Sequence, residues 1–348
     1  MANLLMIDLK DFTLEEMEEF LRKRGQPAYR ARQLMKWIYH KKVREFALMT
    51  DLPRAFQHQL LGQAFASELK PALVQQSRDG TIKYLFRMAD GCQVESVFIP
   101  EERRRTACLS VQAGCPLGCK FCLTGKMGYR RDLTTAEMVN QLLALQDNGL
   151  ITNVVLMGMG EPLLNFDNVM KAISIFTNPL GLGLAARRIT ISTVGIPAKI
   201  AKLAAKAKVN LAVSLHATTE EVRRMLMPVS AKYPLSAVLK ACRDYPVPER
   251  RRITFEYLLI AGINDTPEDA FRLVRLLKGI KCKVNLIPYN EFPGSPFKRP
   301  TEEAVASFQE ILVRNHLTAI IRASRGNDIL AACGQLGASC QEGIWKTG

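Results

Sequence analysis

The spacing of hydrophobic positions is helical at the start of the chain. Between residues 13 and 65, apolar residues recur at helical intervals in "TLEEMEEFLRKRG", "AYRARQLMKWIYHKK" and "DLPRAFQHQLLGQAF". Thr13, with Glu16 three residues later, has the pattern of a capping box, and Gly25 is a typical helix stop. Pro53 falls in the first turn of the third segment. The pattern predicts a small helical domain over residues 1–65.

The period then changes from helical to alternating. The stretch "PALVQQSRDGTIKYLFRMADGCQVESVFIP" alternates apolar and polar residues, and the pairs Asp79-Gly80 and Asp90-Gly91 interrupt it. Such pairs between alternating segments are hairpin signals. We therefore expect a β-hairpin extension over residues 66–104, with two hairpin-linked strands and a third strand that leads into the next domain.

From about residue 105 the chain alternates expected strands with expected helices. The expected strands are "TACLSVQ", "NVVLMGMG", "RITISTVG", "NLAVSLHA", "ITFEYLLIAG", "VNLIPYN" and "LTAIIRAS". This alternation indicates parallel strands joined by right-handed crossovers. Several of these strands end in Gly, Ser, His, Asn or Glu, and β/α barrels carry their chemistry at the C-terminal strand ends. An open doubly wound sheet is the alternative, but no G-x-G-x-x-G follows the first strand.

Composition narrows the class of protein. Apolar residues make up 48% of the 348 residues, which is typical of a globular chain. No run of eighteen apolar residues and no secretory signal pattern is present, so we expect a cytoplasmic protein that does not use a membrane. Nine cysteines, an odd number, argue against a disulfide framework and favour metal or redox chemistry.

The charge points to a polyanionic partner. The net charge is +15, from 48 basic and 33 acidic residues. A single basic cluster is commonly a solvated face. Five clusters together with this net charge favour nucleic acid over a membrane surface, for which no basic amphipathic helix stands out. The clusters are Arg103–Arg105, Arg130–Arg131, Arg187–Arg188, Arg223–Arg224 and Arg250–Arg252.

Three cysteines follow the first expected parallel strand. In "AGCPLGCKFCLTG", Cys115, Cys119 and Cys122 have the spacing C-x3-C-x2-C. Thiolates select iron–sulfur clusters or zinc. A structural zinc site needs four ligands, and no second cysteine pair completes one here. A [4Fe–4S] cluster with three cysteine ligands leaves one iron open. This spacing, with Phe121 before the last cysteine, is the signature of the radical S-adenosylmethionine (SAM) superfamily, and zinc is the alternative.

Polar residues at the ends of later strands form a second candidate site. The stretch "GMGEP" resembles the superfamily motif that meets the amino group of SAM, and "ISTVG", "VSLHA" and "IPYN" each end a different apolar strand. One such ending alone would be an ordinary turn or strand terminus, but four on one expected rim are hard to explain by packing. We expect SAM to be bound by Gly160, Glu161, Ser192, Ser214, Leu215, His216 and Asn290.

Over essentially its whole length, the sequence resembles the RlmN/Cfr family of radical SAM RNA methyltransferases. The resemblance rests on "QVESVFIPE", "CLSVQAGCPLGCKFCLTGKMG", "LMGMGEPLLN", "ITISTVG", "LAVSLHA", "LMPV", "LIAGIND", "VNLIPYN" and "ACGQL". It implies a partial (β/α)6 TIM-like barrel of the radical SAM type over residues 105–348. It also implies that the N-terminal helical domain is an accessory RNA-binding domain. The stretches "GMGEPLLN" and "NLIPYNEFPGSPFKRP" favour the dual-specificity rRNA and tRNA branch over the Cfr branch.

The resemblance implies methylation of adenosine C2 in 23S rRNA at the peptidyl-transferase centre, and of the adenosine next to the anticodon in tRNA. A Cfr-type enzyme would instead methylate C8 of the rRNA base, which confers antibiotic resistance. Two SAM molecules are used per turnover. One methylates a cysteine, and the other is cleaved on the [4Fe–4S] cluster to a 5′-deoxyadenosyl radical that takes a hydrogen from that methyl group. The carbon radical adds to the base, and a second cysteine resolves the covalent RNA adduct by forming a disulfide bond.

The family roles fall on particular residues of this sequence. Cys333 in "AACGQL" matches the methyl-carrying cysteine, Cys108 in "TACLSVQ" the resolving cysteine, and Glu95 in "QVESVFIPE" the proposed base for the adenine proton. The other free thiols match nothing in the family, and we expect structural roles for Cys92, Cys242, Cys282 and Cys340. The resemblance further implies a reductant such as flavodoxin or ferredoxin, and we expect a monomer. The alternative to an enzyme is a zinc-stabilised RNA-binding protein without catalytic activity.

Overall fold

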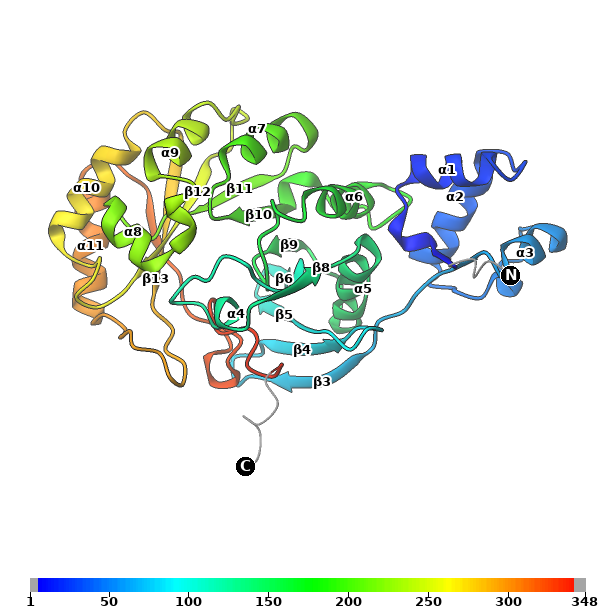
Figure 1. Cartoon of the computed structure of the whole chain (residues 1–348), viewed down its shortest axis with the longest axis horizontal. Coiled ribbons are helices and arrows are strands. Elements are labelled where there is room, and N and C mark those ends of the chain that lie inside the picture. The colour runs from blue at the N-terminus through cyan, green and yellow to red at the C-terminus, as the bar shows by residue number, and fades with distance from the viewer. Residues whose placement is uncertain (1–5, 341–348) are drawn as a thin grey trace.

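The computed structural model describes residues 6–340, and its centre is a ten-stranded sheet (Figure 1). The strand order across the sheet is β14-β13-β12-β11-β10-β9-β6-β5-β4-β3. In chain order the strands are β3 (Pro71–Gln76), β4 (Ile82–Arg87), β5 (Gln93–Glu101), β6 (Arg104–Cys108), β9 (Asn153–Leu156), β10 (Ile189–Thr193), β11 (Asn210–Ser214), β12 (Ile253–Leu259), β13 (Cys282–Pro288) and β14 (Ala319–Ile321).

Seven strands of this sheet, β6 and β9 to β14, are parallel and follow one another in sequence order. All seven predicted parallel strands are therefore confirmed. A doubly wound sheet would reverse its strand order at one point, and this sheet does not, so the doubly wound alternative is wrong. Because each right-handed crossover places its helices on the same face, the sheet is covered from outside as in a partial barrel (Figure 1).

The crossover helices begin where the sequence provides caps. Thr134 and Glu137 form a complete capping box at α5, and Pro197 and Pro267 occupy the first turns of α7 and α10. The helices are α5 (Thr135–Leu145), α6 (Phe166–Thr177), α7 (Pro197–Lys206), α8 (Glu220–Leu226), α9 (Leu235–Arg243), α10 (Pro267–Leu277) and α11 (Glu302–Arg314).

The predicted hairpins extend the sheet beyond β6. Strands β3, β4, β5 and β6 pair in antiparallel fashion. The turns between them contain Gly80 and Gly91, at φ +82° and +83°, a backbone conformation that glycine adopts without strain. A separate antiparallel pair, β7 (Gln112–Gly114) and β8 (Tyr129–Asp132), flanks the short helix α4 (Leu123–Lys126) and carries the three-cysteine segment between its strands.

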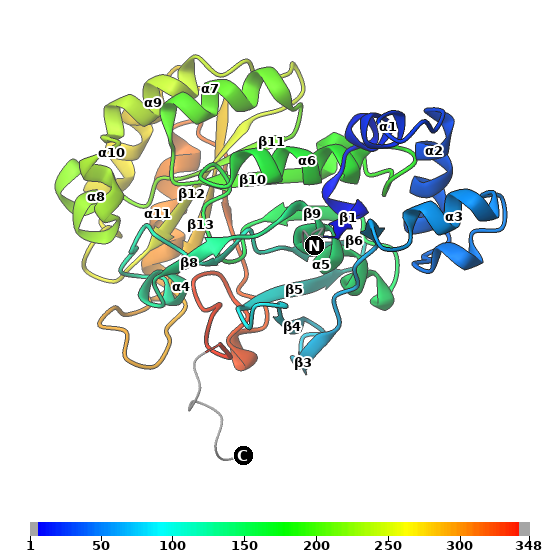
Figure 2. The same cartoon turned by 45° about the vertical axis from the view of Figure 1, so that its right-hand side comes forward.

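The N-terminal helices lie beside the barrel next to α5 and α6 (Figure 2). The capping box predicted from Thr13 and Glu16 is present at α1. Pro53 precedes the first helical residue of α3 and so lies one position before the expected first turn. The α-helices and strands of this region are β1 (Ile7–Asp8), α1 (Leu14–Arg22), α2 (Tyr29–Met35), α3 (Arg54–Leu60) and β2 (Ala64–Phe65), and a π-helical turn (Lys36–His40) follows α2.

Polar contacts join this helical region to the barrel. The Lys10 ammonium donates to Asn140 Oδ1 of α5 at 2.7 Å, and Asp11 accepts the Ala136 N–H at the start of α5 at 2.7 Å. Burial lowers the pKa of Lys10 to about 8. Within residues 6–340, none of the helices has the length and apolar character needed to cross a bilayer.

Candidate active site

A cavity of about 180 Å³ opens at the C-terminal ends of the parallel strands. It gathers side chains from segments that are far apart in the sequence: the three-cysteine segment, the ends of β9 to β13, and the chain after β14. Most of the predicted site residues line it together. They are Cys115, Cys119, Cys122, Gly160, Glu161, Ser192, Ser214, His216 and Cys333.

In the metal loop, residues 112–126, the backbone at Gly114 packs closely against the backbone at Gly128. Gly114 lies at φ +78°, and a Cβ there would come within 1.9 Å of the Gly128 carbonyl oxygen. The next residue, Cys115, donates its N–H to that same oxygen at 2.8 Å. Cys122 donates its N–H to the Cys119 carbonyl at 3.2 Å and caps α4. This compact turn directs three thiols toward one cavity.

The metal loop fits an iron–sulfur cluster chemically. Burial raises the pKa of Cys115 to about 12 and that of Cys119 well above its usual value. Thiolates in this environment therefore need a bound cation, and iron supplies one. Within residues 6–340, no three His, Cys, Asp or Glu side chains gather tightly enough to hold one metal ion. A cluster places each thiolate on a different iron, so its ligands stand farther apart than the ligands of a single ion.

The glycines of "GMGEP" serve protein packing. A Cβ on Gly158 would come within 2.7 Å of Leu109 backbone atoms, and one on Gly160 within 2.5 Å of Gln112 Cβ. The end of β9 can therefore lie directly against the segment that leads into the metal loop. Both glycines also line the cavity, and the expected contact of Gly160 with SAM stays a prediction.

Glu161 is buried in the cavity wall. Its carboxylate accepts N–H groups from Leu163 and Val194, each at 2.9 Å, and joins the ends of β9 and β10. Burial raises the pKa of Glu161 to about 7. A carboxylate has about four acceptor positions, so two backbone contacts leave capacity for a ligand ammonium. Its predicted contact with SAM stays a prediction.

His216 is a neutral ring in the same wall. Its Nδ1 accepts the Leu258 N–H at 3.1 Å, and burial lowers its pKa to about 3. The proton of the neutral ring is then on Nε2. Phe121 of the metal loop meets this ring edge-on, with 4.9 Å between centroids. The aromatic residue of the cysteine motif thus joins the metal loop to the end of β11.

Two predicted SAM-binding residues do not line the cavity. Leu215 is fully buried, and its N–H donates to the Glu256 carbonyl at 3.0 Å. Asn290 donates to the Cys333 carbonyl at 3.3 Å and accepts a hydrogen bond from Ser324 at 2.5 Å. Asn290 therefore supports the segment that carries Cys333.

We call residues 326–340 the carrier loop. Its Cys333 is exposed toward the cavity, and the surrounding protein raises the pKa of this thiol to about 11 through desolvation. The loop is bonded to the metal loop, because Leu123 N–H donates to the Gly334 carbonyl at 2.8 Å and Thr124 Oγ1 donates to the Leu336 carbonyl at 2.7 Å. Cys333 therefore lies beside the metal loop.

Cys108 lies at the end of β6 and does not line the cavity. Burial, and then the charge of Cys333, raise its pKa, so the Cys333 thiol lies within electrostatic range of Cys108. All nine cysteines of the sequence are free thiols in this structure. Burial raises the pKa of Cys242 to about 12 and that of Cys282 to about 11, as expected for core thiols.

Glu95 is fully buried and also lies outside the cavity lining. Its Oε2 accepts the Gly337 N–H at 2.7 Å, its Oε1 accepts the Ser339 N–H at 3.0 Å, and Lys83 Nζ is 3.5 Å from Oε1. The predicted base is therefore covered by the carrier loop.

Glu256 and Tyr289 are among the cavity residues that the sequence analysis missed. Glu256 of β12 lines the cavity beside Cys333, and burial raises its pKa to about 7, while Asn285 donates to it at 2.9 Å. Tyr289 also lines the cavity at the end of β13. The available signal for Glu256 was a single acidic residue in the otherwise apolar stretch "ITFEYLLIAG".

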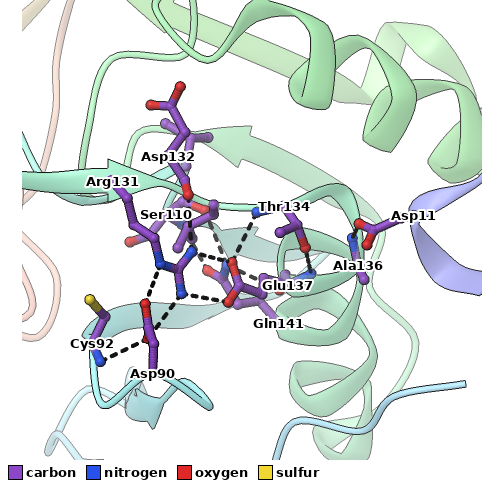
Figure 3. Close-up of polar contacts among 12 residues, drawn as sticks. Asp11, Asp90, Cys92, Ser110, Arg131, Asp132, Thr134, Ala136, Glu137 and Gln141 are labelled. Carbon is purple, nitrogen blue, oxygen red and sulfur yellow. Dashed lines mark hydrogen bonds and ion pairs between the residues drawn. The ribbon is translucent and has the colours of Figure 1, made fainter. Parts of the chain in front are cut away.

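Several arginines of the basic clusters have structural roles. Arg131 binds Asp90 and Glu137, and so joins the β4–β5 turn to α5 (Figure 3). Arg223 is fully buried and donates to Ser230 and to the Val194 carbonyl. Other basic residues do face open space. Arg87, Lys126 and Arg130 line a second, polar cavity of about 690 Å³, which the carrier loop borders through Cys340.

Comparisons with known proteins agree with this geometry. Residues 109–274 match the model of the radical SAM superfamily, and residues 7–65 match that of the ribosomal RNA large subunit methyltransferase N-terminal domain. The chain is 52% identical to the dual-specificity RNA methyltransferase RlmN of Syntrophus aciditrophicus, over 97% of this chain and 98% of the relative. Its identity to the Geobacter sulfurreducens protein of the same name is 51%, over 95% and 92%. A crystal structure of a radical SAM methyltransferase from Sphaerobacter thermophilus superposes with a TM-score of 0.89 at 43% identity, over 95% and 99%.

Proposed function

The chain belongs to the RlmN family of radical SAM RNA methyltransferases, and we propose that it methylates C2 of adenosine in 23S rRNA and in tRNA. Membership of the radical SAM superfamily implies a [4Fe–4S] cluster and SAM. The observation that carries the proposal is that the three cysteines of the metal loop and the Cys333 thiol line one cavity.

The metal loop would hold the cluster through Cys115, Cys119 and Cys122, because their thiols face the cavity. With SAM bound, the cluster would supply the electron that starts the radical reaction. Glu161, Ser192, Ser214 and His216 would hold SAM from the strand ends that surround the same space. Gly160 would act by bringing the end of β9 against Gln112, and Asn290 would act through the backbone of Cys333.

Cys333 would accept a methyl group and transfer its carbon to the base. The thiol must lose its proton before it attacks the sulfonium methyl group, and desolvation keeps its pKa near 11, so bound cationic SAM would help by stabilising the thiolate. Cys108 would then form a disulfide bond with Cys333 and release the RNA, and Glu95 would take the adenine proton. Two SAM molecules would be consumed, with a flavodoxin or ferredoxin as reductant.

RNA would approach over the second cavity, which basic side chains line. The second cavity, with Arg87, Lys126 and Arg130, borders the carrier loop and offers cations to phosphate groups. The helical region over residues 1–65 would act as an accessory RNA-binding domain, residues 66–104 as the hairpin extension, and residues 105–348 as the catalytic barrel. We expect the enzyme to act as a monomer in the cytoplasm.

The test is anaerobic reconstitution with iron, sulfide, SAM, a reductant and either a 23S rRNA fragment or tRNA. Nucleosides are then separated and identified by mass spectrometry against 2-methyladenosine and 8-methyladenosine standards. We expect 2-methyladenosine from both RNAs. A product consisting only of 8-methyladenosine would assign the Cfr-type reaction, and a colourless zinc-loaded protein without product would support an RNA-binding protein instead.

A further inference from the structure

The carboxylate of Glu95 is bonded to the backbone of the carrier loop. Gly337 N–H and Ser339 N–H donate to its two oxygens at 2.7 and 3.0 Å. Lys83, buried beside it, is 3.5 Å from Oε1 and also reaches the Leu330 carbonyl at 3.4 Å. Together, Glu95 and Lys83 contact the carrier loop on both sides of Cys333.

We propose that Glu95 is a positioning residue that holds the carrier loop in the state where Cys333 faces the cavity, before any RNA is bound. The proposal rests on the proposed function, because it assumes that Cys333 is loaded with a methyl group there. It adds a second task to the one implied by the family. As a base, Glu95 would act only on the adenine, whereas as a latch it would act in the earlier methyl transfer.

The loop needs such a latch because its conformation is not favoured locally. Leu330, just before the Cys333 segment, lies at φ +52°, in the left-handed region that costs a leucine free energy. Gly337 lies at φ +109°, and a Cβ there would come within 2.1 Å of Met127 Sδ. The carrier loop therefore keeps its shape through contacts with neighbouring segments. On the C-terminal side of Cys333, Glu95 accepts the N–H groups of Gly337 and Ser339.

The two tasks of Glu95 exclude each other in time. Its carboxylate is fully buried and has two N–H donors and an ammonium group around it. An adenine can reach this carboxylate only after the Gly337 and Ser339 amides have moved away. Release of the carrier loop and exposure of the base are therefore one event. Such coupling would keep the base covered while Cys333 is being methylated.

The experiment measures methyl loading without RNA. Unmethylated Glu95→Gln protein, reconstituted with its cluster, is mixed with SAM, and the Cys333 peptide is followed by mass spectrometry. Hydrogen exchange is measured for residues 331–340 of the same protein. A glutamine presents an NH2 group to one of the two amides and cannot pair with Lys83 as an anion. We expect exchange in this segment to rise about tenfold or more, and the rate of Cys333 methylation to fall by a similar factor.

Two further variants make the result specific. Glu137→Gln is the matched control, because Glu137 also accepts a backbone N–H and pairs with a cation, but its partners are Thr134 and Arg131 and not the carrier loop. It should load Cys333 at the wild-type rate. Gly337→Ala disturbs the loop while leaving Glu95 intact, so it should resemble Glu95→Gln. If Glu95→Gln does not keep the wild-type cluster absorbance and melting temperature, the Gly337→Ala protein is used instead to test whether a loosened carrier loop slows methylation of Cys333.

The outcomes separate the latch from the proposed function. Wild-type loading and wild-type exchange in Glu95→Gln would overturn the latch and leave only the role as a base. If wild-type protein never methylates Cys333, the proposed function fails. The hydrogen exchange of residues 331–340 then tests separately whether Glu95 holds the carrier loop. Faster exchange with unchanged loading would mean that Glu95 holds the loop without positioning Cys333, which also contradicts the proposal.

Discussion

The metal loop and the carrier loop meet at one cavity, but different kinds of contact hold them. The metal loop begins with β7, which pairs with β8, and Cys115 continues the pairing through the Gly128 carbonyl. The carrier loop is held mainly by side chains from other elements. These are Glu95 on Gly337 and Ser339, Asn290 on Cys333, and Thr124 on Leu336.

The difference teaches which of the two loops can move. A backbone ladder opens only when several hydrogen bonds break together, while individual side chains can change partner one at a time. This suits the proposed roles, because cluster ligands must keep their geometry through every step. A methyl carrier must meet SAM first, then the base, and finally a second thiol.

The largest effect is expected from the metal loop. Cys119→Ala removes a buried thiol in the middle of the three-cysteine segment. Two cysteines cannot hold the cluster in place, so we expect loss of its visible absorbance and iron content, and methylation of RNA at background level. Iron analysis and nucleoside mass spectrometry check this. Cys282→Ala is the control, since Cys282 is a buried thiol outside the cavity lining. Full iron loading in Cys119→Ala would contradict the ligand assignment.

The carrier loop should show an equal loss of product with the cluster intact. Cys333→Ala removes the proposed methyl carrier, so we expect no methylated RNA and no protein–RNA crosslink, with unchanged cluster absorbance. Cys108→Ala lacks the proposed resolving thiol and should accumulate a crosslink through Cys333. Denaturing gels with labelled RNA and peptide mass spectrometry distinguish the two variants. Methylated RNA from Cys333→Ala would exclude the carrier role.

Much of the molecule could be predicted because its signals are local. The capping box of Thr13 and Glu16 lies within one helical turn, and each parallel strand is a short apolar run between helices. The gathering of Cys115 and Ser214 in one cavity also follows from topology, because parallel strands bring their C-terminal ends to the same rim.

The unpredicted part depends on contacts between distant segments. Glu95 is separated by 242 residues from its partner Gly337, and no spacing rule links them. Arg131 and Arg223 belong to basic clusters in the sequence, yet each binds protein groups, because a charge does not determine which way its side chain points. Glu256 illustrates the same limit, since its strand was expected but its place beside Cys333 was not.

A pH profile tests whether the Glu256 carboxylate in the cavity lining is desolvated. Burial raises the pKa of Glu256 from 4.5 to about 7. Between these values the unfolded chain releases a proton that the folded protein keeps, so stability falls by ~3 kcal/mol as pH rises through this window and is constant above it. Glu256→Gln should lack this contribution. Urea unfolding of both proteins at several pH values measures the difference, and parallel profiles would show that the carboxylate is not desolvated.

The smallest effect is expected from loosening the carrier loop alone. Gln335, which is fully buried, donates to the Glu291 carbonyl at 2.7 Å and to Asn327 at 2.8 Å, so Gln335→Ala leaves the loop with fewer partners. We expect about 1–2 kcal/mol less free energy of local opening, seen as faster hydrogen exchange over residues 331–340, with normal cluster loading. The control is Gln309→Ala, which removes a similar donor to the Ala319 carbonyl. If Gln335→Ala also loses its cluster, the two loops are not independent, and the contrast between a fixed metal site and a releasable carrier does not hold.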